Sequence, residues 1–132
     1  MMQATDIDAI RRVLEHHPEL EMAIAFGSVA DGSARADSDL DLAVSAGEPL
    51  STDARITLIE ELAAATGRPV DLIDLSRAGE PLLGEIVTRG QRLAGSDEAF
   101  ARLLTRHLFD QADFLPYRDR ILAERRQAWI GG

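Results

Sequence analysis

The sequence predicts a fold of the α/β (α+β) class, in which helices pack on a small sheet and a long helical segment follows at the C-terminal end. Short apolar runs typical of strands alternate with stretches whose apolar residues recur every three or four positions, as in helices. The chain has 132 residues, 45% of them hydrophobic, which suits one domain with an ordinary core. We expect a core over residues 1–96 and a helical extension of the same domain over residues 97–132.

A helix is predicted first, with Thr5 or Asp6 as its N-cap and its end near Pro18. Its apolar positions share one face: Ile7, Ile10, Val13 and Leu14. The adjacent His16 and His17 would project about 100° apart on a helix, so we interpret them as a helix end rather than as a pair of metal ligands.

Two strands joined by a polar loop follow. Residues 21–26 are predicted to form a strand whose apolar run, Ala23 to Phe26, stops abruptly at Gly27 and Ser28, as a buried strand does when it enters a loop or a helical turn. Residues 39–44 alternate, which places one set on each face of a strand: Asp39, Asp41 and Ala43 on one, and Leu40, Leu42 and Val44 on the other.

This pattern carries a candidate chemistry. Side chains two residues apart on a strand, such as Asp39 and Asp41, are able to converge on divalent ions roughly 3.5 to 4 Å apart, an arrangement used in phosphoryl and nucleotidyl transfer. Gly27 permits a close approach of backbone to phosphate, and Ser28 offers a hydroxyl and an N–H group. Taken singly, Asp-x-Asp on an exposed strand is more often a solvated face than a metal site, and Gly-Ser after a strand is equally common as a plain turn.

A second helix is predicted after Gly47 and Pro49, capped by Ser51 or Thr52 and ended by Gly67. Its predicted buried stripe is Ile56, Ile59, Leu62 and Ala63. Residues 70–75 then read as a buried strand that carries two acids, Asp71 and Asp74.

Asp71 and Asp74 lie three positions apart, so they face opposite sides of a strand and only one is able to join Asp39 and Asp41. We favour Asp71 as the third carboxylate because it lies inside the run, whereas Asp74, near the strand's end, suits a turn or a helix cap. Three carboxylates this close would raise one another's pKa unless a cation neutralises them.

The remainder of the chain is predicted to be mostly helical. A short helix begins at Pro81 and stops at Gly90, and residues 91–94 form an edge strand. From Ser96 a long helical stripe runs past a kink at Pro116. This stripe consists of Phe100, Leu104, His107, Gln111, Phe114, Arg118, Ile121 and Arg125, with aromatic anchors for a partner at Phe114, Tyr117 and Trp129.

Composition limits the classes of function. The formal net charge is −9, all of it in residues 1–96, which makes nucleic acid an unlikely partner and favours small charged substrates or a protein. All fourteen basic residues are Arg and there is no Cys, which excludes lysine and cysteine nucleophiles and thiolate zinc sites. With no apolar stretch long enough for a membrane span and no signal peptide, we expect a cytoplasmic protein without membrane contact.

The spacing Gly27-Ser28, ten residues, Asp39-x-Asp41 resembles the signature of the DNA polymerase β superfamily of nucleotidyltransferases, and the small size resembles the minimal nucleotidyltransferase (MNT) antitoxins paired with HEPN toxins. The resemblance covers about residues 20–95 and implies the mixed sheet of that superfamily. One departure concerns the loop. The family often has Gly-Ser-x-Ala-Arg-Gly, whereas this chain has Asp31 at the Arg position, so Arg35 is the candidate replacement.

The resemblance implies an Mg²⁺-dependent transfer of AMP from ATP to a hydroxyl, with two ions held by Asp39, Asp41 and Asp71. Gly27, Ser28 and Arg35 would contact the phosphates. The implied acceptor is a tyrosine of a HEPN-type toxin, in a hetero-oligomer with this chain as the antitoxin. Two alternatives stay open: a non-catalytic module that masks its partner, and transfer to a small molecule such as an aminoglycoside. The spacing of Arg102 and His107 also resembles that of HEPN ribonucleases, but His107 lies on the packing stripe, so we favour a structural role.

Overall fold

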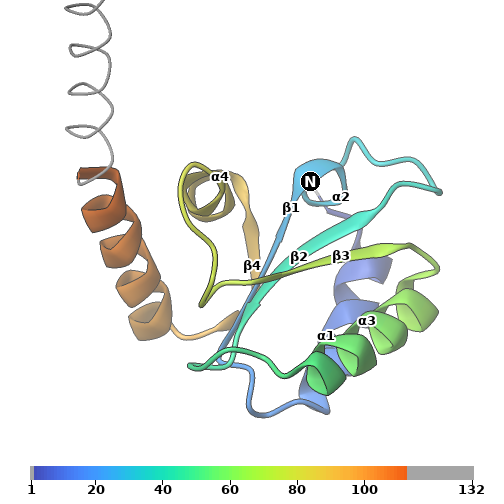
Figure 1. Cartoon of the computed structure of the whole chain (residues 1–132). Coiled ribbons are helices and arrows are strands. Elements are labelled where there is room, and N and C mark those ends of the chain that lie inside the picture. Colours follow the sequence, from blue (N-terminus) through green and yellow to red (C-terminus); the bar gives the residue numbers. More distant parts are fainter. Residues whose placement is uncertain (1, 113–132) are drawn as a thin grey trace, which may run out of the picture.

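The computed structural model describes residues 2–112 and shows a four-stranded mixed sheet between two layers of helices (Figure 1). The strands lie in the order β3-β2-β1-β4, with β2 and β3 parallel and the other neighbours antiparallel. The elements are α1 (Ala4–Glu15), β1 (Met22–Phe26), α2 (Gly27–Asp31), β2 (Leu40–Ser45), α3 (Thr52–Thr66), β3 (Val70–Asp74), α4 (Leu82–Arg89) and β4 (Gln91–Gly95), followed by a helix over residues 97–112.

The two faces of the sheet carry separate hydrophobic clusters, because side chains alternate along each strand. Helices α1 and α3 cover one face, and α4 with the helix of residues 97–112 covers the other (Figure 1). Ala23 and Ala25 of β1 belong to the first cluster, while Ile24 and Phe26 belong to the second. The central strand is thus buried on both sides, which accounts for its continuous apolar run.

The predicted helix boundaries hold closely, with exceptions at the first helix and along the second. The N-cap of α1 is Gln3 rather than Thr5 or Asp6, so both predicted caps lie inside its first turn. Ser51 caps α3 as predicted, accepting a hydrogen bond from the Ala54 N–H at 3.1 Å, and Gly67 ends it at φ 68°. In α3 the buried positions are Leu58 and Leu62, four residues apart, whereas Ile56 points outward and is 48% exposed.

The two histidines at the end of α1 are structural, as predicted. His16 Nδ1 donates to the Arg12 carbonyl at 2.9 Å, and His17 Nε2 lies 2.6 Å from Glu61 Oε2, which joins α1 to α3. Neither approaches a metal-binding arrangement among residues 2–112.

The helix of residues 97–112 packs against the sheet through Ala99 and Leu103, and His107 is 9% exposed beside the carboxylate of Glu80. His107 is therefore a buried packing residue, in agreement with the structural role favoured for it. The predicted continuation of this stripe, the kink at Pro116 and the anchors Phe114, Tyr117 and Trp129 lie outside the described residues. In the part of the chain from 2 to 112, no helix is long and apolar enough to cross a membrane.

Candidate active site

The predicted site residues lie at one end of the sheet, where the end of β1 and the beginnings of β2 and β3 lie side by side. Since β1 runs antiparallel to β2, the end of β1 lies beside the beginning of β2, and Phe26 is registered with Asp41. Since β2 and β3 are parallel, their beginnings lie together, and Asp41 is registered with Asp71. The topology thus brings Gly27 and Asp71, which are more than forty positions apart in the chain, to the same end of the sheet.

Gly27 follows β1 directly and lies against the carboxylate of Asp41. Its φ of 72° falls in the left-handed region that glycine adopts without strain, and a Cβ atom at this position would overlap Asp41 Oδ2. Gly27 is also the first residue of α2 (Gly27–Asp31), a short helical turn that contains Ser28 and has Gly32 as its C-cap. The sequence prediction of a strand followed by a loop with one helical turn is confirmed.

Asp41 is a half-buried carboxylate in an acidic setting. Burial raises its pKa, and the negative charges of Asp71, Asp39 and Glu85 raise it further. Asp39 immediately precedes β2 and is exposed, and Glu85 belongs to α4. Glu85 is a neighbour that sequence spacing had no means of revealing, because it comes from an element packed on the sheet.

The two acids of β3 have different surroundings. Strand β3 lies at the edge of the sheet rather than in its buried centre, so the predicted buried strand is wrong in this respect and Asp71 is exposed. Asp74 is 6% exposed and accepts hydrogen bonds from the Leu50 N–H at 2.9 Å, the Ser76 N–H at 3.0 Å and the Ser76 hydroxyl at 2.7 Å. Asp74 is therefore the turn residue of the pair, as the sequence favoured.

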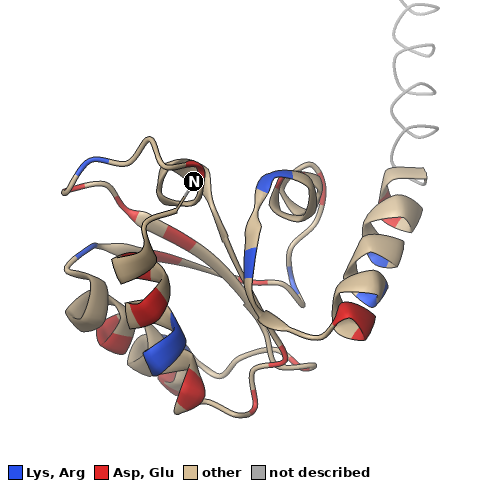
Figure 2. Ribbon diagram, turned by 180° about the vertical axis from the view of Figure 1, so that it is seen from behind, with Lys and Arg blue, Asp and Glu red and all other residues tan. Residues whose placement is uncertain are grey.

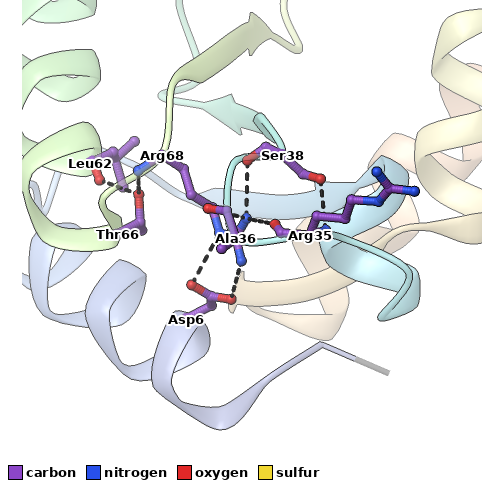
Figure 3. Close-up of polar contacts among 7 residues, drawn as sticks. All are labelled: Asp6, Arg35, Ala36, Ser38, Leu62, Thr66 and Arg68. Carbon is purple, nitrogen blue, oxygen red and sulfur yellow. Dashed lines mark hydrogen bonds and ion pairs between the residues drawn. The ribbon is translucent and has the colours of Figure 1, made fainter.

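The residue that replaces the family arginine, Asp31, is the last of α2, and Arg35 lies in the loop between α2 and β2. Asp31 accepts hydrogen bonds from the N–H and the hydroxyl of Ser33, at 2.8 and 2.6 Å, and closes the turn after α2. Arg35 is exposed, and its guanidinium extends away from Arg68 and Asp6 (Figure 3). Its backbone N–H donates to Ser38 Oγ at 2.8 Å, so the backbone is anchored while the side chain reaches outward.

The chemistry of this edge fits a hard divalent cation. Asp41 and Asp71 offer carboxylate oxygens, the ligands that Mg²⁺ prefers, and the raised pKa of Asp41 shows that its negative charge lacks full compensation from the protein. Among residues 2–112, no three carboxylates or imidazoles are already gathered as a complete metal-binding group. The ligand set Asp39, Asp41 and Asp71 therefore remains a prediction.

Comparison with known proteins points to the same chemistry. The family described as "Polymerase beta, Nucleotidyltransferase" matches residues 8–99. The protein adenylyltransferase MntA of Shewanella oneidensis (strain MR-1) is 36% identical over 104 residues, which cover 76% of this chain and 75% of that protein.

Two solved structures extend the similarity to almost the whole chain. A crystal structure of a toxin–antitoxin with AMP-PNP contains a chain of 29% identity with a TM-score of 0.79, covering 91% of this chain and 98% of that one. A structure of a tri-AMPylated Shewanella oneidensis HEPN toxin in complex with MNT antitoxin has a chain of 31% identity, with a TM-score of 0.68 and coverage of 92% and 99%. The mixed sheet, the strand ends that meet at its edge and these similarities together show that the chain belongs to the polymerase β nucleotidyltransferase family.

Proposed function

We propose that this chain is an Mg²⁺-dependent adenylyltransferase that moves AMP from ATP to a tyrosine hydroxyl of a HEPN-type partner protein, and so acts as an antitoxin. The observation that carries the proposal is the register that sets Asp41 beside Asp71, with Gly27 against Asp41, in a chain 36% identical to a protein adenylyltransferase. The tri-AMPylated toxin bound to a similar antitoxin supports the choice of acceptor.

The proposed reaction is a displacement at the α-phosphorus of ATP. The acceptor oxygen forms a bond to this phosphorus, the bond to the bridging oxygen breaks, and pyrophosphate leaves while the acceptor loses its proton. Asp39, Asp41 and Asp71 would hold Mg²⁺, which when bound lowers the pKa of the attacking hydroxyl and neutralises phosphate charge. Gly27, Ser28 and Arg35 would hold the phosphates of ATP.

A partner protein is expected to complete the acceptor side of the site, because the site residues in the described part of the chain are exposed. Asp71 lies on an edge strand and Asp39 and Gly27 are exposed, so the site is open to solvent on the sheet edge. Acidic positions outnumber basic ones on α1, on α3 and on the strands taken together, and the helix of residues 97–112 carries both signs as well (Figure 2). An acidic domain with an open site suits a basic protein acceptor.

Intact-mass spectrometry of a co-expressed HEPN-type partner protein tests the proposal. Co-expression should add one adenylate mass to the partner for each transfer, and Asp39→Asn with Asp41→Asn should remove the addition. If the partner stays unmodified and its toxicity is still suppressed by this double variant, the chain acts as a non-catalytic module that masks its partner and not as an enzyme. Adenylate found on a small acceptor instead would support the third alternative.

A further inference from the structure

Arg68 lies between α3 and β3, outside the predicted site, and its guanidinium faces the loop that leads to Asp39 (Figure 3). Its Nη1 donates to three backbone carbonyls of that loop, those of Arg35 at 2.6 Å, Ser38 at 3.1 Å and Ala36 at 3.4 Å. The side chain is 12% exposed. A largely buried arginine that donates to several carbonyls of one short segment holds the backbone that carries them, because its planar donors are fixed relative to one another.

Asp6 of α1 holds the other side of the same guanidinium. Its carboxylate oxygens lie 3.5 Å from Arg68 Nε and 3.4 Å from Arg68 Nη2, and its side chain is 13% exposed. The backbone of Arg68 is also anchored, since its N–H donates to Thr66 Oγ1 at 3.3 Å. Arg68 is therefore held at its backbone by Thr66 and at its guanidinium by Asp6, independently of its contacts with the loop.

The start of the loop is tied to α2, because the N–H and hydroxyl of Ser33 donate to Asp31 and the Ala34 N–H donates to the Ser28 carbonyl. Closer to Asp39 the loop contains one turn, with hydrogen bonds from the Arg35 N–H to Ser38 Oγ and from the Ser38 N–H to the Arg35 carbonyl. The Leu40 N–H donates to the Pro69 carbonyl at 2.8 Å, directly after Arg68 in the chain. Arg68 and Pro69 together thus hold both sides of Asp39.

We propose that Arg68, oriented by Asp6, is a positioning residue that holds the loop of residues 33–39 so that Asp39 and Arg35 face the nucleotide. Its link to nucleotide binding rests on the proposed function, whereas its hold on the loop does not. Arg68 touches backbone carbonyls and Asp6, and its effect on the nucleotide passes through the residues it holds.

The test measures loop order and nucleotide affinity in the full chain. In Arg68→Gln, hydrogen exchange of the amides of Ser38, Asp39 and Leu40 should accelerate in nucleotide-free protein, while the amides of β1 keep their protection. The dissociation constant for AMP-PNP with Mg²⁺ should rise about ten- to a hundredfold, the usual effect of losing a residue that orients a metal ligand.

Three further variants separate positioning from charge and from folding. Arg106→Gln removes another arginine-to-carbonyl bond, 2.8 Å to Ala78, and should leave the affinity unchanged. Arg68→Lys keeps the positive charge but lacks the planar guanidinium, so its affinity for AMP-PNP should stay as weak as that of Arg68→Gln. A lysine variant that binds AMP-PNP as tightly as the native chain would overturn the positioning role. Asp6→Asn keeps the arginine and should give a smaller loss in the same direction, which preserves the test if Arg68→Gln unfolds.

The outcomes also separate the two proposals. A native chain that does not bind Mg²⁺ and AMP-PNP contradicts the proposed function, while faster exchange of the loop amides in Arg68→Gln still supports the positioning role. Unchanged exchange of these amides together with unchanged affinity in Arg68→Gln overturns the inference, provided that the native chain binds.

Discussion

Asp71 and Asp74 belong to one short strand, and their surroundings divide the roles of metal binding and structure between them. Asp71 is exposed and registered with Asp41, whereas Asp74 is buried and accepts three hydrogen bonds from the chain that follows β2 and β3. Burial opposes the ionised form of Asp74, but the hydrogen bonds from Leu50 and Ser76 outweigh it and lower the pKa. Of these two acids, only Asp71 is therefore accessible to a ligand at the candidate site.

Substitution of each acid should separate these roles. Asp74→Ala removes the acceptor of the part-buried Leu50 and Ser76 N–H groups and should lower the free energy of unfolding by about 1–3 kcal/mol. The stabilising effect of the native Asp74 carboxylate should be present above pH 3.8, its ordinary pKa, and vanish as the pH falls through the lowered folded-state pKa. Asp71→Asn should change stability by less than about 0.5 kcal/mol while weakening binding of Mg²⁺ with ATP. Denaturant unfolding and calorimetric titration measure the two effects, and a loss of binding confined to Asp74→Ala would reverse the assignment.

At the scale of elements, local signals predicted most boundaries. Ser51 and Gly67 mark the ends of α3 because capping and left-handed turns depend on neighbouring residues alone. The edge position of β3 depends on sheet order, which no local pattern contains. The contacts of Arg68 with the loop and of Glu80 with His107 join residues about thirty positions apart, so sequence spacing did not indicate them.

The same distinction applies to the candidate site. The alternation in residues 39–44 correctly placed Asp41 on the opposite face of the strand from Leu40 and Leu42, because the two-residue period of a strand determines which face each side chain takes. Glu85 was missed because helix packing, rather than periodicity, brings its charge near Asp41.

The helix of residues 97–112 carries apolar side chains on two sides. Its inner side packs on the sheet through Ala99 and Leu103, while Leu108 and Phe109 are 61% and 68% exposed. Under the proposed function, we expect the outer side to contact the partner protein, because exposed apolar patches mark interaction sites and aromatic residues are enriched in interfaces.

Charge introduced on this outer side should disrupt the complex without affecting the fold. Leu108→Glu with Phe109→Glu should weaken partner binding about tenfold or more, and each substitution should change the free energy of unfolding by less than about 0.5 kcal/mol. Ile56→Glu is the matched control, since Ile56 is 48% exposed on the other helical layer. Biosensor titration of the partner measures the affinity, and equal affinities for the double variant and the native chain would exclude this surface from the interface.

At the scale of the whole molecule, the candidate site costs stability when no cation is bound. The folded state raises the pKa of Asp41 above its ordinary 3.8, so the folded chain holds a proton more tightly than the unfolded chain does. The resulting penalty is absent below pH 3.8 and grows until the pH exceeds the raised pKa. At neutral pH, Asp41→Asn should therefore raise the melting temperature of the ligand-free protein, because it removes an ionised carboxylate from an acidic, half-buried position.

Mg²⁺ and ATP should reverse this penalty together, because ligands that bind only the folded state stabilise it by mass action. At ligand concentrations about 100 times the dissociation constant the gain is about 2.7 kcal/mol, which corresponds to a rise of roughly 10 °C in the melting temperature of a domain of this size. Asp39→Asn with Asp41→Asn should begin from a higher melting temperature and show no rise with Mg²⁺ and ATP. Thermal scans of both proteins at pH 7, with and without the two ligands, make the comparison. If the double variant gains as much as the native chain, the nucleotide and its metal bind elsewhere and these aspartates are not the ligands.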